Sequence, residues 1–234
     1  MPDSHCHLTR ALPAKDSGVL SMILSPLPAI LLLLSLSGQV FAKDYMIEII
    51  VLENRGSATS SAQSLYLPRV RDAFGLTGEK ALEAGFELVE TDLALVEVAE
   101  SIEQSPRHRM LRHFAWRQPG LDDDSARSIR INVGSAFKVH IPQEYTQYDY
   151  FIPATATPAL NGSSRELTST TVSGTLTVRL GRFLHLDAVL AFTDTDKGVT
   201  YRLNQSRKMR SRELHYIDNP RFGLLARIRP IEEE

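Results

Sequence analysis

The pattern of apolar and polar positions predicts β-strands along most of the chain. Asp44–Leu52 is rich in β-branched residues and apolar on both faces except at Glu48, which predicts a strand covered on both sides. The alternation in Thr170–Leu180 and in Phe183–Phe192, with a short turn between them, predicts a hairpin. Further strands are predicted at Arg107–Trp116, Ser128–Val133, Phe137–Ile141, Val199–Met209, Glu213–Ile217 and Phe222–Ile228.

One stretch has helical periodicity. Asp92–Gln104 is predicted to form a helix that starts at Asp92, since four apolar residues recur at helical spacing: Leu95, Val98, Ala99 and Ile102. The wider segment Glu79–Glu103 holds eight acidic residues against one lysine, and these acids are expected to form a solvated face. The predicted architecture is therefore α+β: a single domain with a largely antiparallel sheet in its C-terminal half and helical segments packed from the N-terminal half.

The N-terminal segment has the parts of an export signal. The apolar block Leu27–Leu36 follows two basic residues and precedes Val-Phe-Ala, which ends at Ala42. We expect residues 1–42 to be a signal peptide cleaved near Ala42, and residues 43–234 to be a periplasmic domain without stable membrane insertion. The alternative is a retained membrane anchor, but serines and prolines interrupt the apolar run before it reaches the roughly 20 residues of a spanning helix.

Charge and cysteine content narrow the possible partners. With 26 Lys and Arg against 28 Asp and Glu, the formal net charge of −2 gives no general attraction to nucleic acid, and export also argues against a nucleic-acid partner. The one cysteine, Cys6, lies in the expected leader. A mature chain without cysteine suits an oxidising compartment.

Two basic windows, Arg107–Arg117 and Arg202–Arg212, contain no acidic residue. Side by side they would form a cationic face for acidic glycan or phosphate groups; ion pairing with the acids of Glu79–Glu103 is the alternative. Trp116 and Tyr216 are aromatic candidates for stacking on a sugar, although a place in the core is favoured for Trp116. The candidate ligand-binding residues are Trp116, His113, His185, Arg207, Arg210, Arg212, His215 and Tyr216.

Neither a metal site nor a catalytic site is expected. His113, His185 and His215 lie in similar strand settings, but no pair of histidines has metal-ligand spacing. Hydrogen bonds to the backbone, or to Asp187 and Asp218, are expected for them instead of zinc, and no cofactor is expected. The sequence has no nucleophile elbow and no glycine-rich phosphate loop, and no carboxylate is marked as more than a strand-end or turn residue, so we expect no enzyme activity.

Several segments resemble a known family. LRHFAWRQP (111–119), GRFLHLDAVL (181–190) and RKMRSRELHYIDNPRFGLLARI (207–228) are similar to the peptidoglycan-binding CsiV family of cell-shape-integrity proteins from gammaproteobacteria, and YMIEIIVLEN (45–54) is similar to its opening strand. The blocks come in the same order and bracket nearly the whole mature chain. The family often has a second histidine in the turn after the tyrosine, where this chain has Asn219, which weakens the zinc alternative further.

The resemblance implies a periplasmic, non-enzymatic protein that binds peptidoglycan and supports its assembly and cell shape. It also implies work beside an outer-membrane lipoprotein that activates a peptidoglycan synthase. One alternative is a scaffold that binds this activator without binding the wall, and a less favoured one is a wall hydrolase. Because the family supplies no site residues to transfer, the candidates above rest on side-chain chemistry alone.

Overall fold

The chain divides into two units, Met1–Phe41 and Ala42–Glu234, and all described residues belong to the second. The predicted signal peptide, residues 1–42, lies outside the described residues and stays a prediction. No described helix is long and apolar enough to cross a bilayer. The computed structural model describes residues 43–55, 65–70, 72–142, 151–158 and 162–232.

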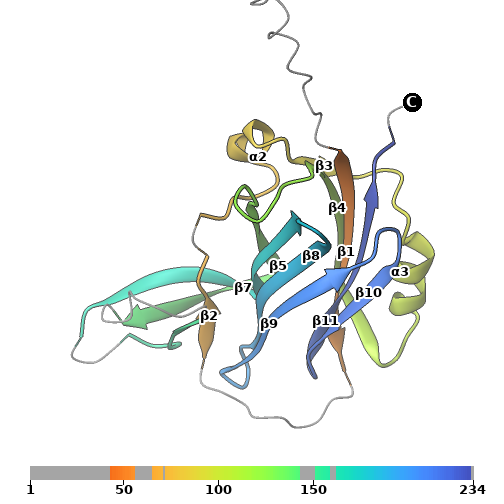
Figure 1. Ribbon diagram of the computed structural model, residues 1–234. Coiled ribbons are helices and arrows are strands. Elements are labelled where there is room, and N and C mark those ends of the chain that lie inside the picture. Colours follow the sequence, from red (N-terminus) through yellow and green to blue (C-terminus); the bar gives the residue numbers. More distant parts are fainter. Residues whose placement is uncertain (1–42, 56–64, 71, 143–150, 159–161, 233–234) are drawn as a thin grey trace, which may run out of the picture. The chain divides into compact units, whose positions relative to one another are not determined.

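Two antiparallel sheets dominate the second unit (Figure 1). Sheet A contains β1 (Asp44–Asn54), β3 (Glu87–Val89), β4 (His108–Pro119), β10 (Leu214–Asp218) and β11 (Phe222–Pro230). Sheet B contains β5 (Ser128–Pro142), β7 (Ser164–Leu180), β8 (Leu184–Asp194) and β9 (Val199–Met209). The strand order is β10-β11-β1-β4-β3 in sheet A and β5-β7-β8-β9 in sheet B. The predicted hairpin is confirmed, because β7 and β8 pair antiparallel.

The inner faces of the two sheets share one hydrophobic core. Ile47, Ile49 and Val51 of β1 meet apolar side chains from every strand of sheet B, together with Trp116 and Phe222 from sheet A. Burying a large apolar side chain stabilises a fold by about 1.5–3 kcal/mol relative to leaving it exposed. This shared core therefore holds the two sheets face to face.

The outer face of β1 is also covered, as its apolar pattern predicts. Ile50 and Leu52 pack against Ala99 and Ile102 of the helix α3 (Val96–Glu103), which lies against sheet A. The apolar spacing that predicted this helix is confirmed, although the helix begins later than predicted. Its exposed residues include several of the acids, so the expectation of a solvated acidic face is also confirmed.

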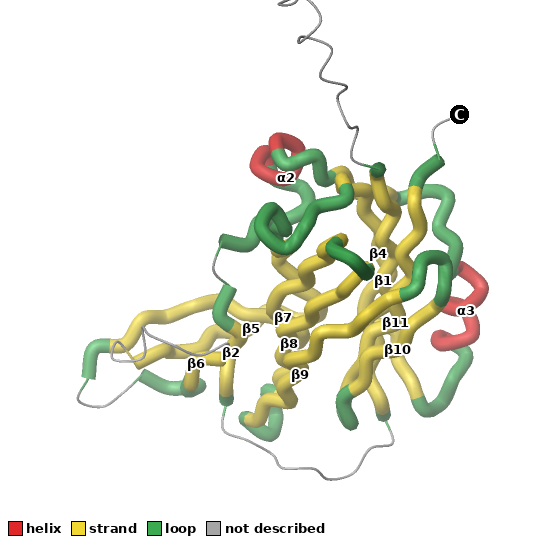
Figure 2. The backbone as a smooth tube through the Cα atoms, viewed as in Figure 1, coloured by secondary structure: helices red, strands yellow, loops and turns green. Residues whose placement is uncertain are grey.

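The α+β prediction overstates the helical content. Within the described residues there are two short helices, α2 (Glu79–Glu83) and α3, and strands account for most of the rest (Figure 2). Sheet A takes three of its five strands, β1, β3 and β4, from the first half of the chain. The segments Ser128–Val133 and Phe137–Ile141, predicted as two strands, are parts of β5, which is irregular between them. The second unit is thus mostly antiparallel β.

The ends of β5 and β7 extend beyond the two stacked sheets and meet a third, two-stranded sheet (Figure 1). Its strands are β2 (Tyr66–Pro68) and β6 (Phe151–Pro153), which pair antiparallel. This extension has a small separate core. The buried residues of that core are Leu65, Leu67, Val139, Ile141 and Ala154.

Candidate functional site

The outer face of sheet B is polar, because alternate residues of its strands point away from the core. Arg179, His185 and Lys208 lie in one row across β7, β8 and β9. Asp187 and Ser206 are opposite each other in the next such row. Both rows lie at the end of the sheet where a turn joins β7 to β8.

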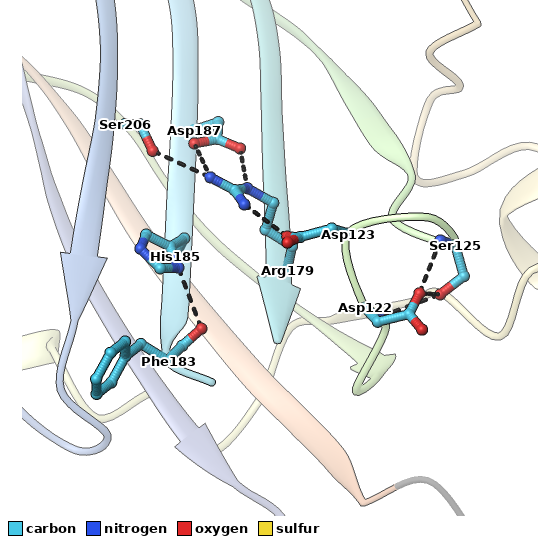
Figure 3. A network of polar contacts seen from close by, with 8 residues as sticks. All are labelled: Asp122, Asp123, Ser125, Arg179, Phe183, His185, Asp187 and Ser206. Carbon is cyan, nitrogen blue, oxygen red and sulfur yellow. Dashed lines mark hydrogen bonds and ion pairs between the residues drawn. The ribbon is translucent and has the colours of Figure 1, made fainter. Parts of the chain in front are cut away.

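Arg179 is the centre of a network of polar contacts on this face (Figure 3). Its Nε donates to Asp187 Oδ2 at 2.6 Å, and its Nη1 donates to Asp123 Oδ1 at 2.5 Å. The hydrogen bonds with Asp187 and then Asp123 raise the pKa of the guanidinium above its ordinary value. Arg179 also contacts Ser206 Oγ at 3.4 Å, so its donors are occupied and it links three strands to a loop.

The loop that supplies Asp123 is fixed by its own hydrogen bonds (Figure 3). Asp122 Oδ1 accepts from Ser125 Oγ at 2.5 Å and from Ser125 N at 2.9 Å. These bonds, first the one from the Ser125 side chain, lower the pKa of Asp122 below its usual range. Such a turn presents Asp123 to Arg179 in a preformed position.

Beside this network, two basic side chains contact one exposed ring, and a histidine bonds to the backbone of the same residue. This Phe183 cluster consists of Arg182, Phe183, His185 and Lys208. The Nζ of Lys208 lies 3.1 Å from the Phe183 ring centroid, and Arg182 Cζ lies 5.5 Å from it. His185 Nδ1 donates to the carbonyl of Phe183 at 3.1 Å, which fixes the tautomer because a carbonyl only accepts. Among the described residues, no carboxylate lies within ion-pair distance of Arg182 or Lys208.

Four of the candidate residues predicted from the sequence lie near the end of sheet B that carries the Phe183 cluster: His185, Arg210, Arg212 and His215. His185 belongs to the Phe183 cluster, and the pairing of β8 with β9 places Phe183 and Arg210 at the same end of sheet B. The backbone N–H of Arg210 donates to His215 Nε2 at 3.0 Å across the turn between β9 and β10. Arg212 lies in the same turn and forms an ion pair with the C-terminal segment.

The two basic windows do not meet. Arg107–Arg117 lies largely on β4 of sheet A, whereas Arg202–Arg212 lies on and just after β9 of sheet B. The alternative, ion pairing with the acids of Glu79–Glu103, is wrong for the pairs observed, because four of the arginines pair with carboxylates outside that segment. Arg207 is exposed, and no described carboxylate pairs with it. The observed pairs are Arg109–Glu53, Arg117–Asp44, Arg210–Glu213 and Arg212–Glu232.

Two other candidates are enclosed by the fold. Trp116 is fully buried, so the favoured alternative of a core position is confirmed, and its ring offers no surface to a sugar. His113 Nε2 donates to Oε1 of the buried Glu48 at 2.7 Å. The Glu48 carboxylate also accepts the backbone N–H groups of Ala94 and Leu95 at 2.9 and 2.8 Å. His113 therefore helps to attach the segment before α3 to sheet A.

The three histidines do not converge on one point. His113 bonds to a carboxylate, while His185 and His215 bond to the backbone as predicted. The predicted carboxylate partners, Asp187 and Asp218, bond to other side chains. Across the described ranges, no three His, Cys, Asp or Glu side chains come together as metal ligands would.

Tyr216 forms a second exposed aromatic surface, on the outer face of sheet A. Its ring crosses Gly223, where an added Cβ would lie 2.7 Å from the ring, so a larger residue there would displace the Tyr216 ring. The hydroxyl donates to Asp218 Oδ1 at 2.9 Å, and Asn54 Nδ2 lies 3.4 Å from the same oxygen. Because neighbouring residues of a strand face opposite sides, Tyr216 points away from His215.

The phenol of Tyr216 is expected to titrate above the usual tyrosine range. Partial burial raises its pKa, and the bond to Asp218 acts in the same direction, whereas the bond from Asn54 opposes both. A raised folded-state pKa contributes stability that is fully present below the ordinary phenol pKa and is lost as the pH rises through the folded pKa. Difference absorbance titration of wild type against Tyr216→Phe measures this group, and a transition at the ordinary phenol pKa would contradict the assignment.

The sequence candidates did not include Arg182, Phe183 or Lys208, although the predicted hairpin gave a reason to consider the first two. Arg182 lies in the turn of the predicted hairpin and Phe183 is the first residue of its second strand, at the end of the sheet where a large aromatic side chain has no core to fill. Lys208 lies in the second basic window, but only the register of β8 with β9 brings it beside His185.

Comparison with known families matches residues 27–231 to the family described as "Peptidoglycan-binding protein, CsiV". The chain therefore belongs to the CsiV family of peptidoglycan-binding proteins, and the resemblance seen in the sequence is confirmed. The family is named for binding and not for a reaction. No curated protein and no solved structure matches the chain.

Proposed function

We propose that this protein binds peptidoglycan in the periplasm without cleaving it, and thereby supports peptidoglycan assembly and cell shape. The observation that carries the proposal is membership of a family described as peptidoglycan-binding over nearly the whole chain. The Phe183 cluster adds chemical support, since exposed cations without a carboxylate partner attract the carboxylates of the wall. The sheet beneath the cluster holds these groups in place.

The proposal includes a protein partner, an outer-membrane lipoprotein that activates a peptidoglycan synthase. Its support is the similarity of residues 45–54, 111–119, 181–190 and 207–228 to the family. A scaffold that binds only this activator, and a wall hydrolase, are the competing functions. For a hydrolase the structure offers little support, because Asp187 is occupied by Arg179 at 2.6 Å.

The proposed function is tested by co-sedimenting residues 43–234 with purified sacculi at low and high salt. We expect binding that weakens at high salt, because salt screens exposed charge contacts, and no soluble muropeptides in the supernatant. Capture of the lipoprotein activator without sacculus binding would favour the scaffold. Release of muropeptides would show that the protein is a hydrolase.

The basic end of β9 is tested by replacing Arg207, Arg210 and Arg212 together with alanine. We expect sacculus binding to fall only about threefold, since exposed charges contribute little each and two of the three are already paired. Arg112→Ala, which removes an exposed arginine from sheet A, is the matched control and should bind like wild type. Salt-insensitive binding with no loss in the triple variant would contradict a cationic contact.

A further inference from the structure

Two cations of the Phe183 cluster remain available to an anion. The ammonium of Lys208 lies over the Phe183 ring, 3.1 Å from its centroid, and the Arg182 guanidinium carbon lies 5.5 Å from the same point. A ring face attracts a cation and fixes its position, but leaves its full charge in place. No carboxylate of the described residues pairs with either cation.

Two carboxylates near the cluster, Asp187 and Asp123, are already ion-paired with Arg179 and do not neutralise Lys208 or Arg182. Arg179 bonds to Asp187 at 2.6 Å and to Asp123 at 2.5 Å (Figure 3). Without Arg179, these two carboxylates would repel an acidic ligand or compete for the free cations. The network around Arg179 therefore keeps the neighbouring Phe183 cluster positive.

The geometry favours a carboxylate over a neutral sugar. Stacking of a sugar requires an open aromatic face, but one face of Phe183 is occupied by the Lys208 ammonium. An ammonium and a forked guanidinium, both positioned against the same ring, suit carboxylate ligands. The other ring nitrogen of His185, Nε2, has no hydrogen-bond partner among the described residues. While the ring proton stays on Nδ1, Nε2 can accept a hydrogen bond from an amide N–H of the ligand. Carboxylates next to amide groups are the chemistry of the peptides of the wall, whereas glycan strands present mainly hydroxyl and acetamide groups.

We infer that the Phe183 cluster binds the acidic stem peptide of peptidoglycan, with Lys208 and Arg182 as ion-pair partners of stem-peptide carboxylates. This inference rests on the proposed function and names the part of the wall that is bound. Phe183 acts in it as a positioning residue, because its ring holds the Lys208 ammonium at the surface.

The ligand is tested by competition for the chain bound to sacculi. Three soluble probes are compared: a tetrapeptide of L-alanine, D-glutamate, diaminopimelate and D-alanine, the same peptide with its carboxyl groups amidated, and an uncharged N-acetylglucosamine oligomer. We expect only the acidic peptide to displace the protein. Displacement by the sugar oligomer alone, or equally by both peptides, would overturn the inference while leaving the proposed function intact. Failure to bind sacculi at all would overturn the proposed function.

The residues are tested by charge-removing substitutions. Lys208→Gln and Arg182→Gln are each expected to weaken acidic-peptide binding about tenfold, as for the loss of a charge-assisted hydrogen bond. Phe183→Leu keeps both charges and should weaken it about threefold, because the ammonium loses its fixed position. The control is Lys197→Gln in the turn at the opposite end of β8 and β9, where the lysine side chain is 65% exposed. Equal binding by the Lys208 and Lys197 variants would overturn the assignment.

Discussion

Replacing Glu48 with alanine is expected to lower the free energy of unfolding by about 3 kcal/mol. Glu48 is 3% exposed, and its carboxylate is the shared acceptor of three donors. Its Oε1 accepts from His113 Nε2 at 2.7 Å and from Leu95 N at 2.8 Å, while Oε2 accepts from Ala94 N at 2.9 Å. Alanine leaves these donors without an acceptor beneath α3, and each unpaired buried donor costs about 1–3 kcal/mol.

Urea denaturation followed by circular dichroism measures this loss. The matched control is Glu166→Ala, which removes a half-exposed carboxylate paired with Lys138 at 2.9 Å. Exposed pairs contribute roughly 0–1 kcal/mol, so this variant should unfold close to wild type. Equal stability of the two alanine variants would show that Glu48 does not attach α3 to sheet A.

Gly174→Ala is expected to prevent sheet B from forming as described, at a cost of more than about 4 kcal/mol. Gly174 lies in the middle of β7 at φ 144°, a conformation that residues with a Cβ rarely adopt. An added Cβ would lie 2.0 Å from the carbonyl oxygen of Val189 and 2.9 Å from Leu190 Cα. These are backbone atoms of the neighbouring strand, so they can move only if β7 and β8 separate.

The control for Gly174 is Gly198→Ala, which separates backbone strain from steric overlap. Gly198 also has a positive φ, 64°, but an added Cβ there meets nothing within 4 Å. Strain alone costs roughly 1–2 kcal/mol, so this variant should fold with a modest loss of thermal stability. Soluble Gly174→Ala protein that unfolds like Gly198→Ala would contradict the predicted overlap.

Most of the long strands could be predicted from the sequence, because alternation of apolar and polar residues is a local signal. Val199–Met209 matches β9 at both ends, and β1, β8 and β11 begin at or next to their predicted first residues. The three-residue strands β2, β3 and β6 are too short to show a period, so they were not predictable. The start of α3 was also missed, because Glu48, far away in the sequence, accepts the N–H groups just before it.

The candidate site was predictable only in part. Sequence alone marked the basic window that contains Lys208 and the block that contains Arg182, Phe183 and His185, because these are properties of short segments. Which strand faces are buried, and which charges neutralise each other, depends on cross-strand register. That register places His185 between Arg179 and Lys208, and it leaves Asp187 within reach of Arg179. The sequence by itself therefore determined the family, the strands and the supply of cations, whereas the tertiary structure alone decided which cations stay free, because ion pairing depends on neighbours in space.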